Sequence, residues 1–149
     1  MQLLSFGTKL KISKKGKIIF NGRISSRSGV CIYSSGGVVQ ITHSFFNHNC
    51  IITGMSRIEI GDGCIFGPNV QVFDHDHVFG KNGVVPNKYN IEPITIGKNV
   101  WVGANAIILR GSKIGDNCVI GAGCIIRGGI PENSRVIQRR ELQIDPLRD

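Results

Sequence analysis

The chain has 149 residues, of which 41% are hydrophobic, and a formal net charge of +8. This length predicts one domain. No run of 18 or more apolar residues occurs, so no transmembrane helix is predicted. The first residues, Met-Gln-Leu-Leu-Ser-Phe-Gly, lack the basic and long apolar regions of a signal peptide.

Residues 1–17 are expected to form a leader with weak strand character. The leader contains a cluster of basic side chains: Lys9, Lys11, Lys14, Lys15 and Lys17. Three interpretations are open for this cluster: solvated surface charge, attraction of an anionic cofactor or polyanionic acceptor, and nucleic-acid binding. The third has the least support, because no basic-aromatic motif accompanies the lysines.

From residue 18 onward, β-branched or aromatic residues recur every six positions. The spacing is ragged before residue 60, where two registers are separated by Ser-Ser-Gly-Gly at 34–37: Ile18, Ile24 and Val30, then Val39, Phe45 and Ile51. It is regular later, in the series Ile96, Val102, Ile108, Ile114, Ile120 and Ile126. A small residue follows four positions after each of the first five: Val100, Ala106, Ser112, Cys118 and Cys124.

A period of six fits neither an α-helix nor a simple amphipathic sheet, but it fits a parallel β-helix in which each hexapeptide forms one side of a triangular coil. Pairs such as Lys98-Asn99 and Asp116-Asn117 supply the corner conformations. We therefore predict an all-β solenoid with coils over residues 18–131 and a short C-terminal cap, helical or extended, over residues 132–149.

Residues 73–93 interrupt the repeat with glycines, prolines and polar side chains, and this pattern predicts one extended loop. Long loops on rigid scaffolds often carry function. His75 and His77 lie where the repeat breaks and would face the same side of an extended segment.

The five cysteines form no Cys-x-x-Cys motif, and at least three occupy the small inward position of the repeat. Thiols there act as small hydrophobic groups. A structural role is therefore favoured over catalysis, metal binding or disulfides, and it suits a reducing, cytoplasmic location.

The segment 94–126, with its Ile-Gly-x-Asn-Val-Trp-Val-Gly block, resembles the hexapeptide-repeat acyltransferases. The galactoside, maltose, Nod-factor and capsular-sugar O-acetyltransferases and the xenobiotic acetyltransferases are the most similar groups, over about residues 45–133. The resemblance implies a left-handed parallel β-helix and a homotrimer with active sites between subunits. It also implies acetyl-CoA as acyl donor, no metal, and a sugar or glycan-precursor hydroxyl as acceptor.

In this family a histidine at the break in the repeat acts as general base. An ungapped alignment from the preceding Ile60–Val70 block places His77 there, with His75 as the alternative. An imidazole, whose unperturbed pKa is ~6.5, can accept the proton of a sugar hydroxyl. Asp74, Asp76 or Glu92 would orient the ring, and the sequence does not choose among them.

The resemblance also implies binding residues. It places an acceptor-binding amide at Asn47, with Asn49 and Asp76 as further polar candidates, although the two asparagines fit a corner ladder equally well. The residues implied for the cofactor groove are Trp101, Gly103, Ala104, Ala122, Arg127 and Arg135. Alternative roles are a trimer-interface aromatic for the tryptophan, a turn for the glycine, and solvated or interface charge for the arginines.

Other functions remain open on this fold. An amino-sugar N-acyltransferase or a xenobiotic acetyltransferase would use the same scaffold. A γ-type zinc carbonic anhydrase would need three histidines at subunit interfaces, and the chain has four: His43, His48, His75 and His77. A non-catalytic β-helix scaffold is the last alternative.

Overall fold

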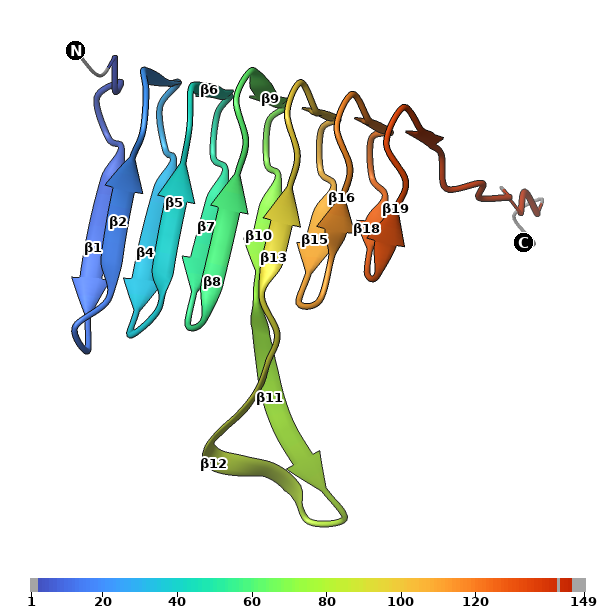
Figure 1. Ribbon diagram of the computed structural model, residues 1–149. Helices are drawn as coiled ribbons and strands as arrows, with labels where there is room; N and C mark the ends of the chain where they lie inside the picture. Colours follow the sequence, from blue (N-terminus) through green and yellow to red (C-terminus); the bar gives the residue numbers. More distant parts are fainter. Residues whose placement is uncertain (1–2, 142, 146–149) are drawn as a thin grey trace.

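The computed structural model describes residues 3–141 and 143–145 and shows a parallel β-helix of six triangular coils (Figure 1). Each coil contributes one strand to each of three six-stranded parallel sheets. This confirms the predicted all-β, left-handed parallel β-helix. Within the described residues, no helix is long and apolar enough to cross a membrane.

The strands of the three sheets follow the coils in order. The first sheet contains β1 (Lys9–Ser13), β4 (Cys31–Ser35), β7 (Ile51–Gly54), β10 (Gln71–Phe73), β15 (Ile107–Leu109) and β18 (Ile125–Ile126). The second contains β2 (Lys17–Phe20), β5 (Val38–Ile41), β8 (Arg57–Ile60), β13 (Ile94–Ile96), β16 (Lys113–Ile114) and β19 (Gly129–Ile130). The third contains β3 (Ile24–Ser26), β6 (Ser44–Phe46), β9 (Cys64–Phe66), β14 (Trp101–Val102), β17 (Val119–Ile120) and β20 (Arg135–Val136).

The core is a set of ladders, because strand register places equivalent residues of successive coils against one another. Val102 pairs with Phe66 on one side and with Ile120 on the other. The rings of Phe46 and Phe66 stack with centroids 4.6 Å apart. The predicted inward series Ile96 to Ile126 is buried throughout, with at most 4% of any side chain exposed. The small residues between them are buried as well.

Asparagines at the corners adopt left-handed backbone conformations and form side-chain ladders. Asn99, Asn117 and Asn133 have φ values of 53°, 56° and 58°. The Nδ2 of Asn99 donates to Asn117 at 3.2 Å, and that of Asn117 donates to Asn133 at 3.0 Å. Asparagine tolerates this conformation better than most residues, which explains the predicted corner pairs.

The coils extend beyond both predicted boundaries. Strand β1 pairs with β4 from Lys9 to Ser13, so residues 9–17 belong to the first coil rather than to a leader. At the other end, β20 completes the sixth coil at Val136, inside the predicted cap. Residues 137–141 and 143–145 form neither helix nor strand. Residues 1–2 of the predicted leader, and residues 142 and 146–149 of the predicted cap, lie outside the described residues.

The interruption at residues 73–93 forms an antiparallel hairpin, which projects from the corner between the first and second sheets (Figure 1). Its strands are β11 (His75–Gly80) and β12 (Gly83–Ile91), with an irregularity in register between His77 and Phe79. The predicted loop is therefore a regular element that leaves the solenoid in coil 4.

Candidate functional site at the base of the hairpin

Asp74 lies at the bend between β10 and the hairpin, and its side chain is fully buried at 0% exposure. Its Oδ1 accepts the backbone N–H of Met55 at 2.8 Å, and its Oδ2 accepts that of Ser56 at 2.7 Å. A buried carboxylate is costly unless it is hydrogen-bonded, and coil 3 supplies those two bonds.

The same carboxylate holds the ring of His75. The distance from Asp74 Oδ1 to His75 Nδ1 is 3.0 Å, and the histidine side chain is 17% exposed. A carboxylate partner places the proton on Nδ1, so Nε2 keeps its lone pair. The arrangement is an oriented imidazole that can accept a proton.

His77 lies on the same side of β11, as the sequence predicts. Its ring is 4.8 Å from that of Tyr89 on β12, and the ring of His75 is 5.9 Å from the same tyrosine. His77 is exposed, and within the described part of the chain no carboxylate is hydrogen-bonded to its ring. No pattern in the sequence pointed to Tyr89, which contacts both histidines because the hairpin pairs β12 with β11.

Asp76 lies between the two histidines in sequence and takes part in an ion network with the next coil. Its Oδ2 accepts from Arg110 Nε at 2.6 Å, and its Oδ1 accepts from Asn90 Nδ2 at 2.7 Å. Arg110 Nη1 also donates to Glu92, and Arg127 Nη2 lies 3.8 Å from the Glu92 carboxylate. The hydrogen bonds from Arg110 and Asn90 lower the pKa of Asp76.

The candidate acceptor residues Asn47 and Asn49 lie at another corner, between the third and first sheets. Asn49 has a φ of 59°, and its N–H donates to Ser28 O at 3.0 Å. The side-chain oxygen of Asn47 accepts the N–H of His48 at 2.8 Å. Within one chain the structure does not bring these asparagines to the Asp74–His75 pair.

Most of the candidate cofactor residues share the third sheet and its corner with the first sheet. Trp101 is 54% exposed on β14 and pairs in register with Ile65, which is 50% exposed. Arg135 on β20 pairs with the neighbouring Val119. Ala104 and Ala122 follow at the corner in coils 4 and 5. Arg127 does not join them, because it lies beside Glu92 near the hairpin.

Gly103 has a packing requirement of its own. A Cβ at this position would lie 2.6 Å from the backbone nitrogen of Ala122 in the next coil. Its backbone φ is not positive, so the reason for glycine here is the close approach of the two coils rather than a turn.

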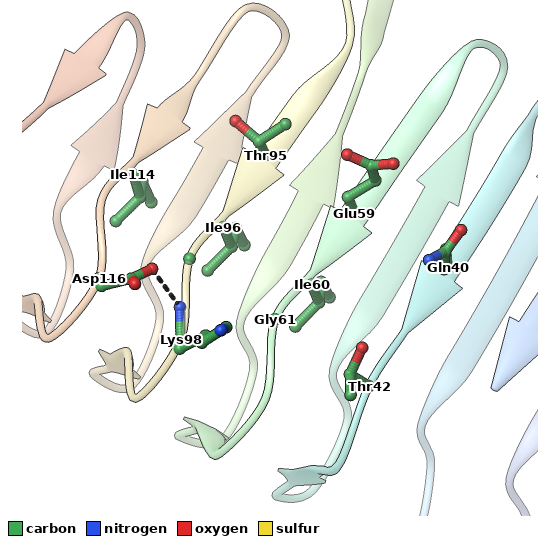
Figure 2. A pocket seen from close by; sticks show the side chains of 11 residues that line it. Gln40, Thr42, Glu59, Ile60, Gly61, Thr95, Ile96, Lys98, Ile114 and Asp116 are labelled. Atoms are coloured by element: carbon green, nitrogen blue, oxygen red, sulfur yellow. Dashed lines mark hydrogen bonds between the residues drawn. The ribbon is translucent and has the colours of Figure 1, made fainter. Parts of the chain in front are cut away.

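A polar groove of about 380 Å³ lies on the second sheet (Figure 2). Gln40, Glu59 and Thr95 line it from three successive strands that pair in register. Near the corner, the backbone N–H of Lys98 donates to Asp116 Oδ1 at 2.7 Å. The sequence pattern did not point to this groove, because the repeat fixes the residue type at inward positions and leaves the outward positions free to vary.

Comparison with known proteins identifies the family to which the sequence is related. The model of the bacterial transferase hexapeptide (six repeats) matches residues 93–128. A galactoside O-acetyltransferase of Escherichia coli (strain K12) is 42% identical over 106 residues, which cover 68% of this chain and 50% of that protein. The chain therefore spans about half the length of this relative.

A second relative is covered more fully. The putative lipopolysaccharide biosynthesis O-acetyl transferase WbbJ of Escherichia coli (strain K12) is 30% identical over 134 residues, which cover 83% of this chain and 68% of that protein.

Solved structures show the same fold. A maltose O-acetyltransferase from Clostridium difficile 630 matches with a TM-score of 0.57 and 30% identity, over 83% of this chain and 62% of that one. AntD, an N-acyltransferase from Bacillus cereus solved in complex with dTDP and 3-hydroxybutyryl-CoA, matches with a TM-score of 0.69 over 88% of this chain and 72% of that one, and at 19% identity it shares the fold alone. By its repeats, its coils and these relatives, the chain belongs to the hexapeptide-repeat acyltransferase family.

Proposed function

We propose that this protein is an acetyl-CoA-dependent O-acetyltransferase that acts on a hydroxyl of a sugar or glycan precursor, with His75 as its general base. The observation that carries this proposal is the Asp74–His75 pair, in which a buried carboxylate with two backbone hydrogen bonds orients an imidazole at the base of a projecting hairpin. The galactoside and maltose O-acetyltransferases among its relatives support the reaction class.

The proposed reaction transfers an acetyl group from sulfur to oxygen. The Nε2 atom of His75 takes the proton of the acceptor hydroxyl while the hydroxyl oxygen attacks the thioester carbonyl carbon. The tetrahedral intermediate then collapses, the carbon–sulfur bond breaks, and the imidazolium returns its proton to the sulfur of coenzyme A. Asp74 stabilises the imidazolium, and general base catalysis of this kind contributes typically ~10²–10⁴-fold in rate.

Trp101, Ala104, Ala122 and Arg135 support a cofactor groove along the third sheet, because small side chains at the corner leave room beside the exposed indole for an extended pantetheine. In this proposal Gly103 allows the close coil spacing beneath the groove. Arg127 is the candidate for a phosphate contact on the hairpin side.

A homotrimer would complete this site. Asn47 and Asn49 lie at a different corner of the triangular coils from His75, so a second subunit is needed to bring an acceptor amide to the imidazole. The hairpin also presents an apolar tip, in which Phe79 and Val84 pair across the strands and are 75% and 61% exposed. Such a tip fits a neighbouring subunit. His77 and Asp76 would flank the acceptor.

The test is release of coenzyme A from acetyl-CoA with a panel of acceptors that includes galactosides, maltose and amino sugars. His75→Ala should lower kcat by about 10²–10⁴-fold with cofactor affinity retained, whereas the matched variant His77→Ala, which removes a ring beside the acceptor, should raise the acceptor KM and keep most of its kcat. Turnover lost only in His77→Ala would move the base to that residue. Acetyl amides as the sole products, or no transfer to any acceptor, would contradict the proposed reaction.

A further inference from the structure

The N-terminal end of the solenoid exposes side chains that belong to its interior. Leu10 and Ile12 on β1 pair with Ile32 and Ser34, both of which point inward and are 0% exposed. In the first coil, however, Leu10 is 45% and Ile12 is 59% exposed, because no further coil covers them within the described residues. Phe6, just before β1, is 99% exposed.

The same end carries the net charge of the molecule. Residues 1–58 contain eight of the 18 basic side chains and none of the ten acidic ones, so the remaining 91 residues carry ten of each and are neutral. Five of the eight lie in or beside β1 and β2 and are all exposed: Lys9, Lys11, Lys14, Lys15 and Lys17. An apolar end is thus surrounded by positive charge that no acidic residue of coils 1 and 2 offsets.

We propose that this end, formed by Phe6, β1 and β2, docks on an anionic lipid bilayer. Lysines near such a surface are attracted to acidic headgroups, while exposed apolar side chains enter the boundary between headgroups and acyl chains. A polyanion in water would use the lysines but leave Phe6, Leu10 and Ile12 exposed. A second copy of the chain is a poor partner for this end, because the two positively charged ends would repel each other.

This proposal stands independently of the proposed reaction, but it has a geometric consequence for it. The hairpin leaves coil 4, three coils above the docking end, and parallel strands stack ~4.8 Å apart. The Asp74–His75 pair would therefore stand about 15 Å above the bilayer.

Flotation of the full chain with vesicles tests the proposal. Binding should occur with mixed phosphatidylcholine and phosphatidylglycerol, be absent with phosphatidylcholine alone, and weaken as salt screens the lysines. The double variant Lys9→Gln/Lys11→Gln should bind about 30-fold more weakly. The control variant Lys81→Gln/Lys88→Gln, which removes the same charge from the hairpin, should bind like the parent chain.

A second pair of variants tests the apolar contribution. Phe6→Ser should weaken vesicle binding, while Ile144→Ser, at a position that is 86% exposed in the C-terminal tail, should not. No binding to anionic vesicles at low salt would overturn the proposal, as would equal loss in the two lysine variants. Equally tight binding to dextran sulfate, unaffected by Phe6→Ser, would instead identify a polyanion site.

Discussion

At the scale of single residues, buried thiols fill positions that leave little room at the corners. Cys50 and Cys64 donate to the carbonyl oxygens of Gly67 and Gly97 at 3.2 and 3.1 Å, and burial raises the pKa of each thiol to about 11. Ala106 fills the same kind of position in another coil and is equally buried. These observations support the predicted structural role of the two cysteines, because a neutral, enclosed thiol is a poor nucleophile.

These thiols make stability depend on pH in the alkaline range. Because the folded pKa of about 11 lies above the ordinary value of 9.0, the unfolded chain loses these protons first. Their stabilising contribution is complete below pH 9 and is lost as pH rises toward 11. Melting temperatures measured across this range by circular dichroism should fall less steeply for Cys50→Ala/Cys64→Ala than for the parent chain. Equal slopes would contradict the assignment.

At the scale of elements, the hairpin depends on a contact with the following coil. Arg110, at the end of β15, binds Asp76 on β11 and Glu92 just after β12, so one guanidinium holds both sides of the hairpin base. Charged hydrogen bonds of this kind fix orientation as well as adding energy. Since His75 lies on the same strand as Asp76, the network also holds the proposed base in place.

Removing that guanidinium should loosen the hairpin and leave the solenoid intact. In Arg110→Ala, backbone amides of residues 75–91 should exchange with deuterium several times faster, because their strands lose the contact with coil 5, and kcat should fall. Lys88→Ala, at an exposed position on the same hairpin, serves as the control. Unchanged exchange in Arg110→Ala would show that strand pairing alone holds the element.

At the scale of the whole molecule, each coil is supported only by its neighbours, so the fit between coils determines stability. Gly103 and Gly129 allow this fit to be tested, because a side chain at the first would meet the next coil and a side chain at the second would not. A Cβ at Gly103 would lie 2.6 Å from a backbone nitrogen of the next coil, whereas a Cβ at Gly129 would meet nothing within 4 Å.

Alanine at these two positions should have different costs. Gly103→Ala forces two coils apart and should lower the free energy of unfolding by about 1–3 kcal/mol. Gly129→Ala should change it by less than about 0.5 kcal/mol. Urea unfolding of both variants gives the comparison, and similar values for the two would contradict the coil-spacing argument.

The hexapeptide period predicted the fold, because one inward side chain per six residues is a strong and repeated constraint. It failed in coils 2 and 3, where Phe45 and Ile51 keep the spacing but face outward, and Phe46 and Ile52 are buried instead. Val39, just after the irregular corner at residues 34–37, is buried as predicted, and the register shifts at the next corner, where the inward Ile41 is followed by the inward Phe46 after five residues rather than six.

The candidate site was predicted only in part. That His75 and His77 share a side follows from alternation along a strand. The contact between Asp74 and His75 does not, because adjacent residues of a regular strand point to opposite sides, and only the bend at residue 74 lets the two side chains meet. Counting residues from an aligned block cannot detect such a bend, so the sequence alone favoured His77.

The unequal distribution of charge between the first 58 residues and the remaining 91 gives the molecule a permanent electric dipole along the solenoid axis. Its positive pole is coil 1. Near a negatively charged surface, such as a cation-exchange resin, a sensor chip or a cell envelope, the solenoid would rotate so that coil 1 faces the surface before contact. It would then arrive end-on, with its later coils standing away from the surface and open to diffusing reactants.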